Sequence, residues 1–181
     1  MTKPPFRKLR KSYDIQGHAH ALTFSTFHRR PFFRDPDVCD LFLNCLHEAR
    51  NVVGFQVWGF VVMPEHVHIL VFSNSAAVTV ARILRYVKAP FAKQCLLRWP
   101  NIRADCKIVD KDGSNTFQFW QAGGGYDRNI WDLHVVLEEV DYFHMNPVKR
   151  GLCERPEDWA WSSARHYADL DSVFRLDELP G

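Results

Sequence analysis

Two histidines, His66 and His68, stand one residue apart at the start of an apolar run. An earlier apolar run ends at Met63, Pro64 follows, and the second run occupies 67–72, which predicts two strands joined by a tight turn. Side chains two residues apart on a strand share a face, so both imidazoles can bind one divalent metal ion. The same pair would also suit two half-buried strand histidines without a ligand, so the chemical interpretation needs a third partner.

A tyrosine and an asparagine further along the chain are candidates for that partner. The segment from Asn129 to Met145 has the clearest helical periodicity, and Pro147 predicts its end near Asn146. Tyr142 and Asn146 lie within roughly 40° of each other at 100° per residue, so they share one helical face. If this face lies across the histidine edge of a sheet, Asn146 offers an amide oxygen to the metal and Tyr142 an oxygen nucleophile. Taken singly, a tyrosine on the polar side of a helix is more often a plain surface residue.

Other residues compete for these roles. His18 and His20 have the same spacing as the first pair but precede a strand-like run without the turn, and we rank them lower. Tyr126 is the rival tyrosine, and its glycine-rich setting predicts a loop with a packing or DNA-positioning role. Glu65 should point away from the histidine face, so we assign no general base.

The remaining periodicity predicts the elements that must position these residues. A first strand is expected over 20–27, a helix from Asp35 to about Asn51, strands over 55–63 and 66–72, a helix over 78–98 that Pro90 should kink or interrupt, and a short strand over 116–120. The 129–145 helix should pack its apolar side on the sheet through Leu133, Val136, Leu137, Val140, Phe143 and His144.

Composition favours one compact domain. The chain has 181 residues, 46% of them hydrophobic, with a polar, basic arm over 1–17 and a C-terminal extension over 152–181. We find no apolar run long enough for a membrane span and no signal-peptide core, and we expect a cytoplasmic protein without a membrane partner. The five cysteines show no Cys-x-x-Cys pair, so we expect them reduced and mostly structural.

Basic residues are informative through their clustering, because the net charge is only +2. The candidates for contact with nucleic-acid phosphates are Arg82, Arg85, Lys88, Lys149 and Arg150. For the first three, a solvated helix face is the simpler interpretation. Trp159 and Trp161 are more readily understood as anchors that pack the C-terminal segment than as stacking platforms.

Four motifs together resemble one known family, over roughly residues 13–167. They are Val62-Met-Pro-Glu-His-Val-His-Ile-Leu70, then Phe119-Trp-Gln121 with Tyr126-Asp127-Arg128, then Asp141-Tyr-Phe-His-Met-Asn-Pro-Val-Lys-Arg-Gly151, and Trp159-Ala-Trp-Ser-Ser163. In this order they resemble the REP-associated tyrosine transposases, a branch of the single-tyrosine transposases in the HUH endonuclease superfamily. The segment 102–115 is longer than the link expected in that family, and the glycine triplet before Tyr126 is unusual.

The resemblance implies an α+β, ferredoxin-like βαββαβ domain with an antiparallel sheet. It also implies that His66, His68 and Asn146 bind Mg²⁺ or Mn²⁺ and that Tyr142 is the nucleophile. Such enzymes cut single-stranded DNA beside a hairpin, leave a 5′-phosphotyrosine and a free 3′-hydroxyl, and rejoin strands by the reverse step. A monomer is favoured, with a homodimer as the alternative.

Two other functions stay open. The chain could be a hairpin DNA-binding protein that keeps the scaffold without cutting. It could also be a metal-dependent nucleotide phosphoesterase, although Leu70 stands where a histidine-triad hydrolase would need a further histidine.

Overall fold

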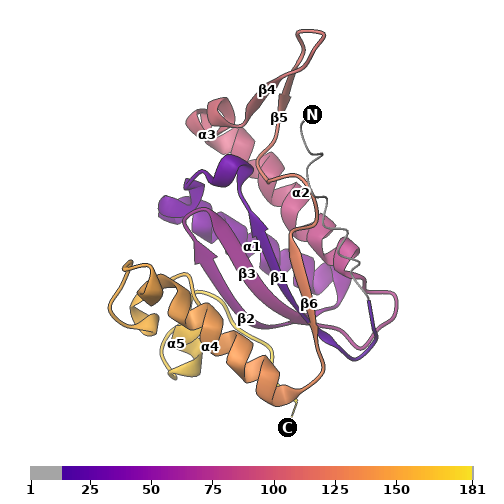
Figure 1. The fold of residues 1–181 in the computed structure, drawn as a ribbon, viewed down its shortest axis with the longest axis vertical. Helices are drawn as coiled ribbons and strands as arrows, with labels where there is room; N and C mark the ends of the chain where they lie inside the picture. Colours follow the sequence, from indigo (N-terminus) through magenta and orange to yellow (C-terminus); the bar gives the residue numbers. More distant parts are fainter. Residues whose placement is uncertain (1–13, 181) are drawn as a thin grey trace, which may run out of the picture.

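A four-stranded antiparallel sheet forms the centre of the molecule. The computed structural model describes residues 14–180, so most of the predicted basic arm lies outside the described residues. The core elements, in chain order, are β1 (Ala19–Ser25), α1 (Pro36–Val53), β2 (Gln56–Met63), β3 (His66–Phe72), α2 (Val80–Arg98), β6 (Tyr126–Ile130) and α4 (Leu133–Lys149). The strand order is β2-β3-β1-β6, and every neighbouring pair is antiparallel (Figure 1). This arrangement confirms the predicted α+β, ferredoxin-like βαββαβ fold.

Local sequence signals define the first helix and the central hairpin. Asp35 caps α1 by accepting a hydrogen bond from the backbone N–H of Asp37, and Gly54 ends the helix in the left-handed region at φ 83°. Pro64 and Glu65 form the tight turn between β2 and β3. The predicted strand over 66–72 matches β3 residue for residue.

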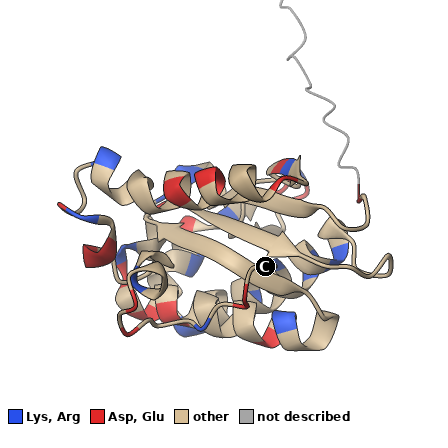
Figure 2. Ribbon diagram, turned by 90° about the horizontal axis from the view of Figure 1, so that it is seen from below, with Lys and Arg blue, Asp and Glu red and all other residues tan. Residues whose placement is uncertain are grey.

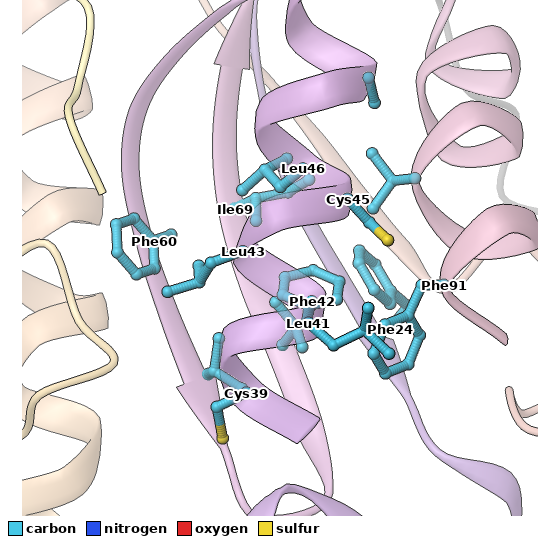
Figure 3. Close-up of a cluster of buried hydrophobic side chains, with 14 of the residues drawn as sticks. Phe24, Cys39, Leu41, Phe42, Leu43, Cys45, Leu46, Phe60, Ile69 and Phe91 are labelled. Carbon is cyan, nitrogen blue, oxygen red and sulfur yellow. The ribbon is translucent and has the colours of Figure 1, made fainter. Parts of the chain in front are cut away.

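The two faces of the sheet are covered by different helices. Figure 2 shows helices on both sides of the strands, with acidic and basic segments interspersed. On one face, α1 and α2 pack on the sheet around a large apolar core, part of which is labelled in Figure 3. On the other face α4 packs against β2, where a smaller apolar cluster includes Leu70, Val140 and Phe143.

Strand β6 and the limits of α4 differ from the prediction. Residues 126–130 form a strand paired with β1, so the helix begins at Leu133 rather than Asn129. It also continues through Pro147 to Lys149. The Asn146 side chain donates to the backbone oxygen of Tyr142 at 2.7 Å, and Arg150 N–H donates to the Asn146 oxygen, so the last turn stays closed around the proline.

Two other expectations about helices were wrong. Leu133 and Leu137 are 43% and 40% exposed and lie outside the apolar cluster on this face of the sheet. Of the two effects expected of Pro90, a kink or an interruption, the interruption is wrong, because α2 runs unbroken from Val80 to Arg98.

Two excursions complete the chain. Between α2 and β6, a short helix and a hairpin project from the sheet (Figure 1): α3 (Pro100–Asp105), β4 (Lys107–Val109) and β5 (Asn115–Phe117). After α4, Trp159 and Trp161 anchor the C-terminal segment, as predicted, by donating their indole N–H groups to the Val62 carbonyl and to the Asp40 carboxylate. Within residues 14–180, every helix is too short or too polar to cross a lipid bilayer.

Candidate active site

Strand β3 presents His66 and His68 on the face covered by α4. They pair with Met63 and Val61 of β2 on one side and with Ser25 and Thr23 of β1 on the other. The two Nε2 atoms lie 3.0 Å apart, and both side chains are buried. The structure therefore brings the two predicted histidines to one point at the end of the sheet.

Each imidazole is held through its other nitrogen. His66 Nδ1 lies 2.9 Å from Glu65 Oε1, and His68 Nδ1 lies 2.7 Å from Thr23 Oγ1. The carboxylate accepts, so His66 donates from Nδ1 and its Nε2 keeps a lone pair in the neutral ring. Such partners fix the tautomer and orientation of metal-binding histidines.

The position of Glu65 corrects the sequence-based expectation. Glu65 was expected to point away from the histidine face, but its carboxylate contacts His66 and is buried. Strand alternation does not apply because Glu65 belongs to the turn rather than to β3. Its Oε1 also accepts from Arg150 at 2.5 Å and from Arg29 at 3.2 Å.

The environment favours neutral imidazoles and an ionised carboxylate. Burial, reinforced by the neighbouring His66, lowers the pKa of His68 to about 3. Burial also lowers the pKa of His66, against the opposing effect of Glu65. Burial by itself would raise the pKa of Glu65, but the hydrogen bonds and charges of Arg150 and His66 outweigh it and lower that pKa. Neutral imidazoles are metal ligands.

Helix α4 brings Tyr142 beside this pair. The ring centroids of Tyr142 and His68 are 5.8 Å apart at 83°, and Tyr142 is 47% exposed. The helix approaches closely because β2 has Gly59 beneath it, where a Cβ would come within 3.1 Å of a Val140 methyl. Lys149 lies with its Nζ 5.5 Å from the centre of the Tyr142 ring.

Two open clefts meet at the histidine pair. The first, which we call the tyrosine cleft, has a volume of about 520 Å³ and is lined by Thr23, His68, Tyr126, Arg128, Glu138, Glu139 and Tyr142. The second, the arginine cleft, has a volume of about 620 Å³ and is lined mainly by Arg29, Arg34, Glu65, His66, Asn146 and Arg150. Tyr142 thus lines the same cleft as His68, and Asn146 lines the same cleft as His66, although the two residues share one helix.

Tyr126 does not lie in a loop, as its glycine-rich neighbourhood suggested. It is the first residue of β6 and pairs with Thr23 of β1. The preceding Gly125 has φ 84°, and a Cβ there would lie 2.1 Å from the Thr23 backbone oxygen, so only glycine permits this close approach. Both candidate tyrosines therefore line the tyrosine cleft.

The other predicted residues lie away from the histidine pair. Helix α2, which carries Arg82, Arg85 and Lys88, covers the opposite face of the sheet, and Lys88 is half-buried near the Phe24 and Trp120 rings. His20 alternates to that face as well, where His20 Nδ1 contacts Asp127 Oδ1 at 2.9 Å.

The two histidines alone do not complete a metal site. Among the described residues, no group of three or more His, Cys, Asp or Glu side chains could hold a metal ion. Two neutral imidazoles whose Nε2 atoms converge, with Asn146 lining the same cleft as His66, nevertheless provide a partial set. Mg²⁺ commonly keeps water and phosphate oxygens in the remaining positions.

Comparison with known proteins adds independent information. The model of the IS200-like transposase family matches residues 14–121, which end before α4. A Haemophilus influenzae protein that carries the name REP-associated tyrosine transposase is 25% identical over 133 residues, which are 70% of this chain and 69% of that protein. The solved structure of a REP-associated tyrosine transposase bound to a REP hairpin is 20% identical, with a TM-score of 0.70 over 95% of this chain and 93% of that one. The similarity to this solved structure establishes the fold.

Proposed function

The chain belongs to the IS200-like transposase family of DNA-cleaving and rejoining enzymes, and we propose that it acts as a REP-associated tyrosine transposase. In this proposal it cuts single-stranded DNA beside a hairpin through a 5′-phosphotyrosine on Tyr142. One observation carries the assignment: the Tyr142 ring lies 5.8 Å from that of His68, beside two imidazoles with converging Nε2 atoms.

The reaction exchanges one phosphodiester for another. Tyr142 Oη forms a bond to phosphorus while the bond from phosphorus to the 3′ oxygen breaks, and the phenol proton ends on the released 3′-hydroxyl. Attack by a 3′-hydroxyl on the phosphotyrosine reverses the step and rejoins strands. No nucleotide triphosphate is consumed, because the number of phosphoester bonds is unchanged.

His66, His68 and Asn146 would hold Mg²⁺ or Mn²⁺, which would supply positive charge to the phosphate oxygens. Glu65 and Thr23 keep the imidazoles oriented. Lys149, near the Tyr142 ring, is available for phosphate contact. Arg150 mainly holds the Glu65 carboxylate. Because the Arg150 side chain is 43% exposed, part of its guanidinium group can also contact DNA.

Hairpin recognition and monomeric action complete the proposal. A structural neighbour is bound to a REP hairpin, and we extend that class of ligand to this chain. Because the histidines and Tyr142 of a single chain already lie together, one protomer contains the full candidate set. A monomer is therefore favoured.

The test uses a single-stranded hairpin DNA labelled at its 3′ end, incubated with Mn²⁺ and separated on a denaturing gel. We expect a labelled band shifted by the mass of the protein, which EDTA prevents. Tyr142→Phe should abolish this band while hairpin binding persists, and Tyr126→Phe, from the same cleft, should retain it. Cleavage to a free 5′-phosphate without an adduct would favour a phosphoesterase, and binding without cleavage would favour a DNA-binding protein.

A further inference from the structure

The arginine cleft and the tyrosine cleft differ in charge. In the tyrosine cleft, Arg128 lies with Glu138 and Glu139, so acidic groups outnumber basic ones. In the arginine cleft, three arginines face one carboxylate. Both clefts open at the histidine pair, with His68 lining the first and His66 the second. A DNA strand that crosses this point thus meets two different electrostatic environments.

Glu65, the single carboxylate in the arginine cleft, already accepts several hydrogen bonds. Glu65 Oε1 accepts from Arg29, Arg150 and His66. Arg34 is exposed and has no side-chain hydrogen bond or ion pair among residues 14–180. The cleft therefore keeps an excess of positive charge, as expected of a surface that contacts phosphates.

The backbone that places Arg29 here is strained. His28 and Arg29 have φ 52° and 54°, in the left-handed region that non-glycine residues rarely adopt. Neighbouring contacts hold this conformation: Thr26 Oγ1 donates to the Arg30 oxygen at 2.6 Å, and Phe33 N–H donates to the Pro64 oxygen at 3.0 Å. Strain of this kind persists where surrounding structure enforces it, often at functional sites.

The geometry of the reaction indicates which cleft holds the DNA on the 5′ side of the cut. In phosphoryl transfer the attacking and leaving oxygens lie roughly in line on opposite sides of phosphorus. Tyr142 attacks from the tyrosine cleft, so the departing 3′ oxygen lies toward the arginine cleft. On the basis of the proposed function, we infer that the arginine cleft binds the backbone phosphate on the 5′ side of the cut and retains the strand that ends in the 3′-hydroxyl for rejoining.

Arg34 is the residue to test, because Arg29 and Arg150 also hold Glu65. The matched control is Arg30→Ala: Arg30 belongs to the same loop but pairs with Asp105 at 2.6 Å, outside the cleft. Binding is measured in a Tyr142→Phe background with three hairpin DNAs. One is unmodified, one carries a neutral methylphosphonate at the phosphate 5′ of the scissile one, and one carries it 3′ of the scissile phosphate.

We expect Arg34→Ala to weaken binding of unmodified DNA by about fivefold and to lower the salt slope by about one. The loss should vanish on the 5′-neutral DNA and persist on the 3′-neutral DNA, while Arg30→Ala matches its parent on all three. With Tyr142 intact, Arg34→Ala should still form the adduct but rejoin the released strand about fivefold less.

Two results would overturn the assignment of the 5′-side strand to the arginine cleft without touching the proposed function. In the first, the loss caused by Arg34→Ala vanishes on the 3′-neutral DNA instead of the 5′-neutral DNA. In the second, Arg34→Ala and Arg30→Ala behave identically although the unsubstituted protein forms its adduct. Absence of any adduct on unmodified DNA would refute the proposed function and the strand assignment together.

Discussion

The two faces of the sheet have different chemical characters although the same strands build both. Toward α1 and α2, side chains such as Phe60 and Ile69 are fully buried in a large apolar core. Toward α4, the apolar contacts include Leu70 but give way to His68 and His66 at the turn end of β3. Consecutive residues of one strand thus serve stability on one side and the candidate chemistry on the other. Mutations on the two faces should therefore separate folding from cleavage.

Apart from removal of the nucleophile itself, the largest effect on cleavage is expected from His68→Ala, on the α4 face. Removing one imidazole of the pair should slow adduct formation roughly a thousandfold or more, since metal-assisted charge stabilisation contributes several kcal/mol. Single-turnover adduct rates and urea unfolding measure the two properties in parallel. Near-normal cleavage accompanied by collapsed stability would break the comparison between the faces.

The largest effect on stability is expected from Phe91→Ala, on the opposite face. The Phe91 ring is fully buried and packs against the rings of Phe33, Phe42 and Phe119. Its truncation should lower the free energy of unfolding by about 3–5 kcal/mol. Leu97→Ala, on the same helix but 65% exposed, is the control and should cost far less. Equal costs for the two substitutions would show that this face lacks the expected core.

Glu65→Gln should have an intermediate effect on the α4 face. It removes the charge that orients His66, so Mn²⁺ affinity, followed by calorimetry, should fall about tenfold. Glu48→Gln, on an exposed part of α1, should leave that affinity unchanged. If both variants bound Mn²⁺ equally well, Glu65 would not be a positioning residue.

Acid should weaken the α4 face through His144, whose buried Nε2 lies 2.8 Å from Ser163 Oγ. Burial lowers the pKa of His144 from 6.5 to about 4, so the unfolded state binds the proton more readily and stability falls as pH drops through this window. Between about pH 7.5 and about pH 5, His144 alone should contribute a loss of about 2 kcal/mol, to which the buried His66 and His68 add.

The control for His144 is His134, an exposed histidine of the same helix. His144→Gln should reduce the acid-induced loss, whereas His134→Gln should retain it, because the His134 side chain is 82% exposed. Unfolding free energies measured at both pH values decide the matter, and parallel curves for His144→Gln and the unsubstituted protein would exclude His144 as the cause.

The sequence predicted the elements whose signals are local. Pro64 and the alternating runs around it located the central hairpin, and Asp35 with Gly54 bounded α1. Strand β6 was missed because the strand is short and mostly polar, and because its partner, β1, lies about a hundred residues away in the chain. No periodicity in five edge-strand residues distinguishes them from the start of a helix.

The candidate site was predicted only in part, for a similar reason. The spacing of His66 and His68 on a strand required them to share a face, and the structure agrees. Glu65 and Thr23 were not recognised as their partners, nor Arg29 as a partner of Glu65, because each contact depends on a turn or on strand pairing. A buried carboxylate beside a histidine pair was the one available signal, and strand alternation was applied to it incorrectly.

The most direct test identifies the tyrosine that carries DNA. The adduct formed with hairpin DNA and Mn²⁺ is digested with nuclease and protease, and the phosphorylated peptide is sequenced by mass spectrometry. The account predicts a nucleotide 5′-phosphate on Tyr142 with Tyr126 unmodified. Modification of Tyr126 with Tyr142 left free would contradict it.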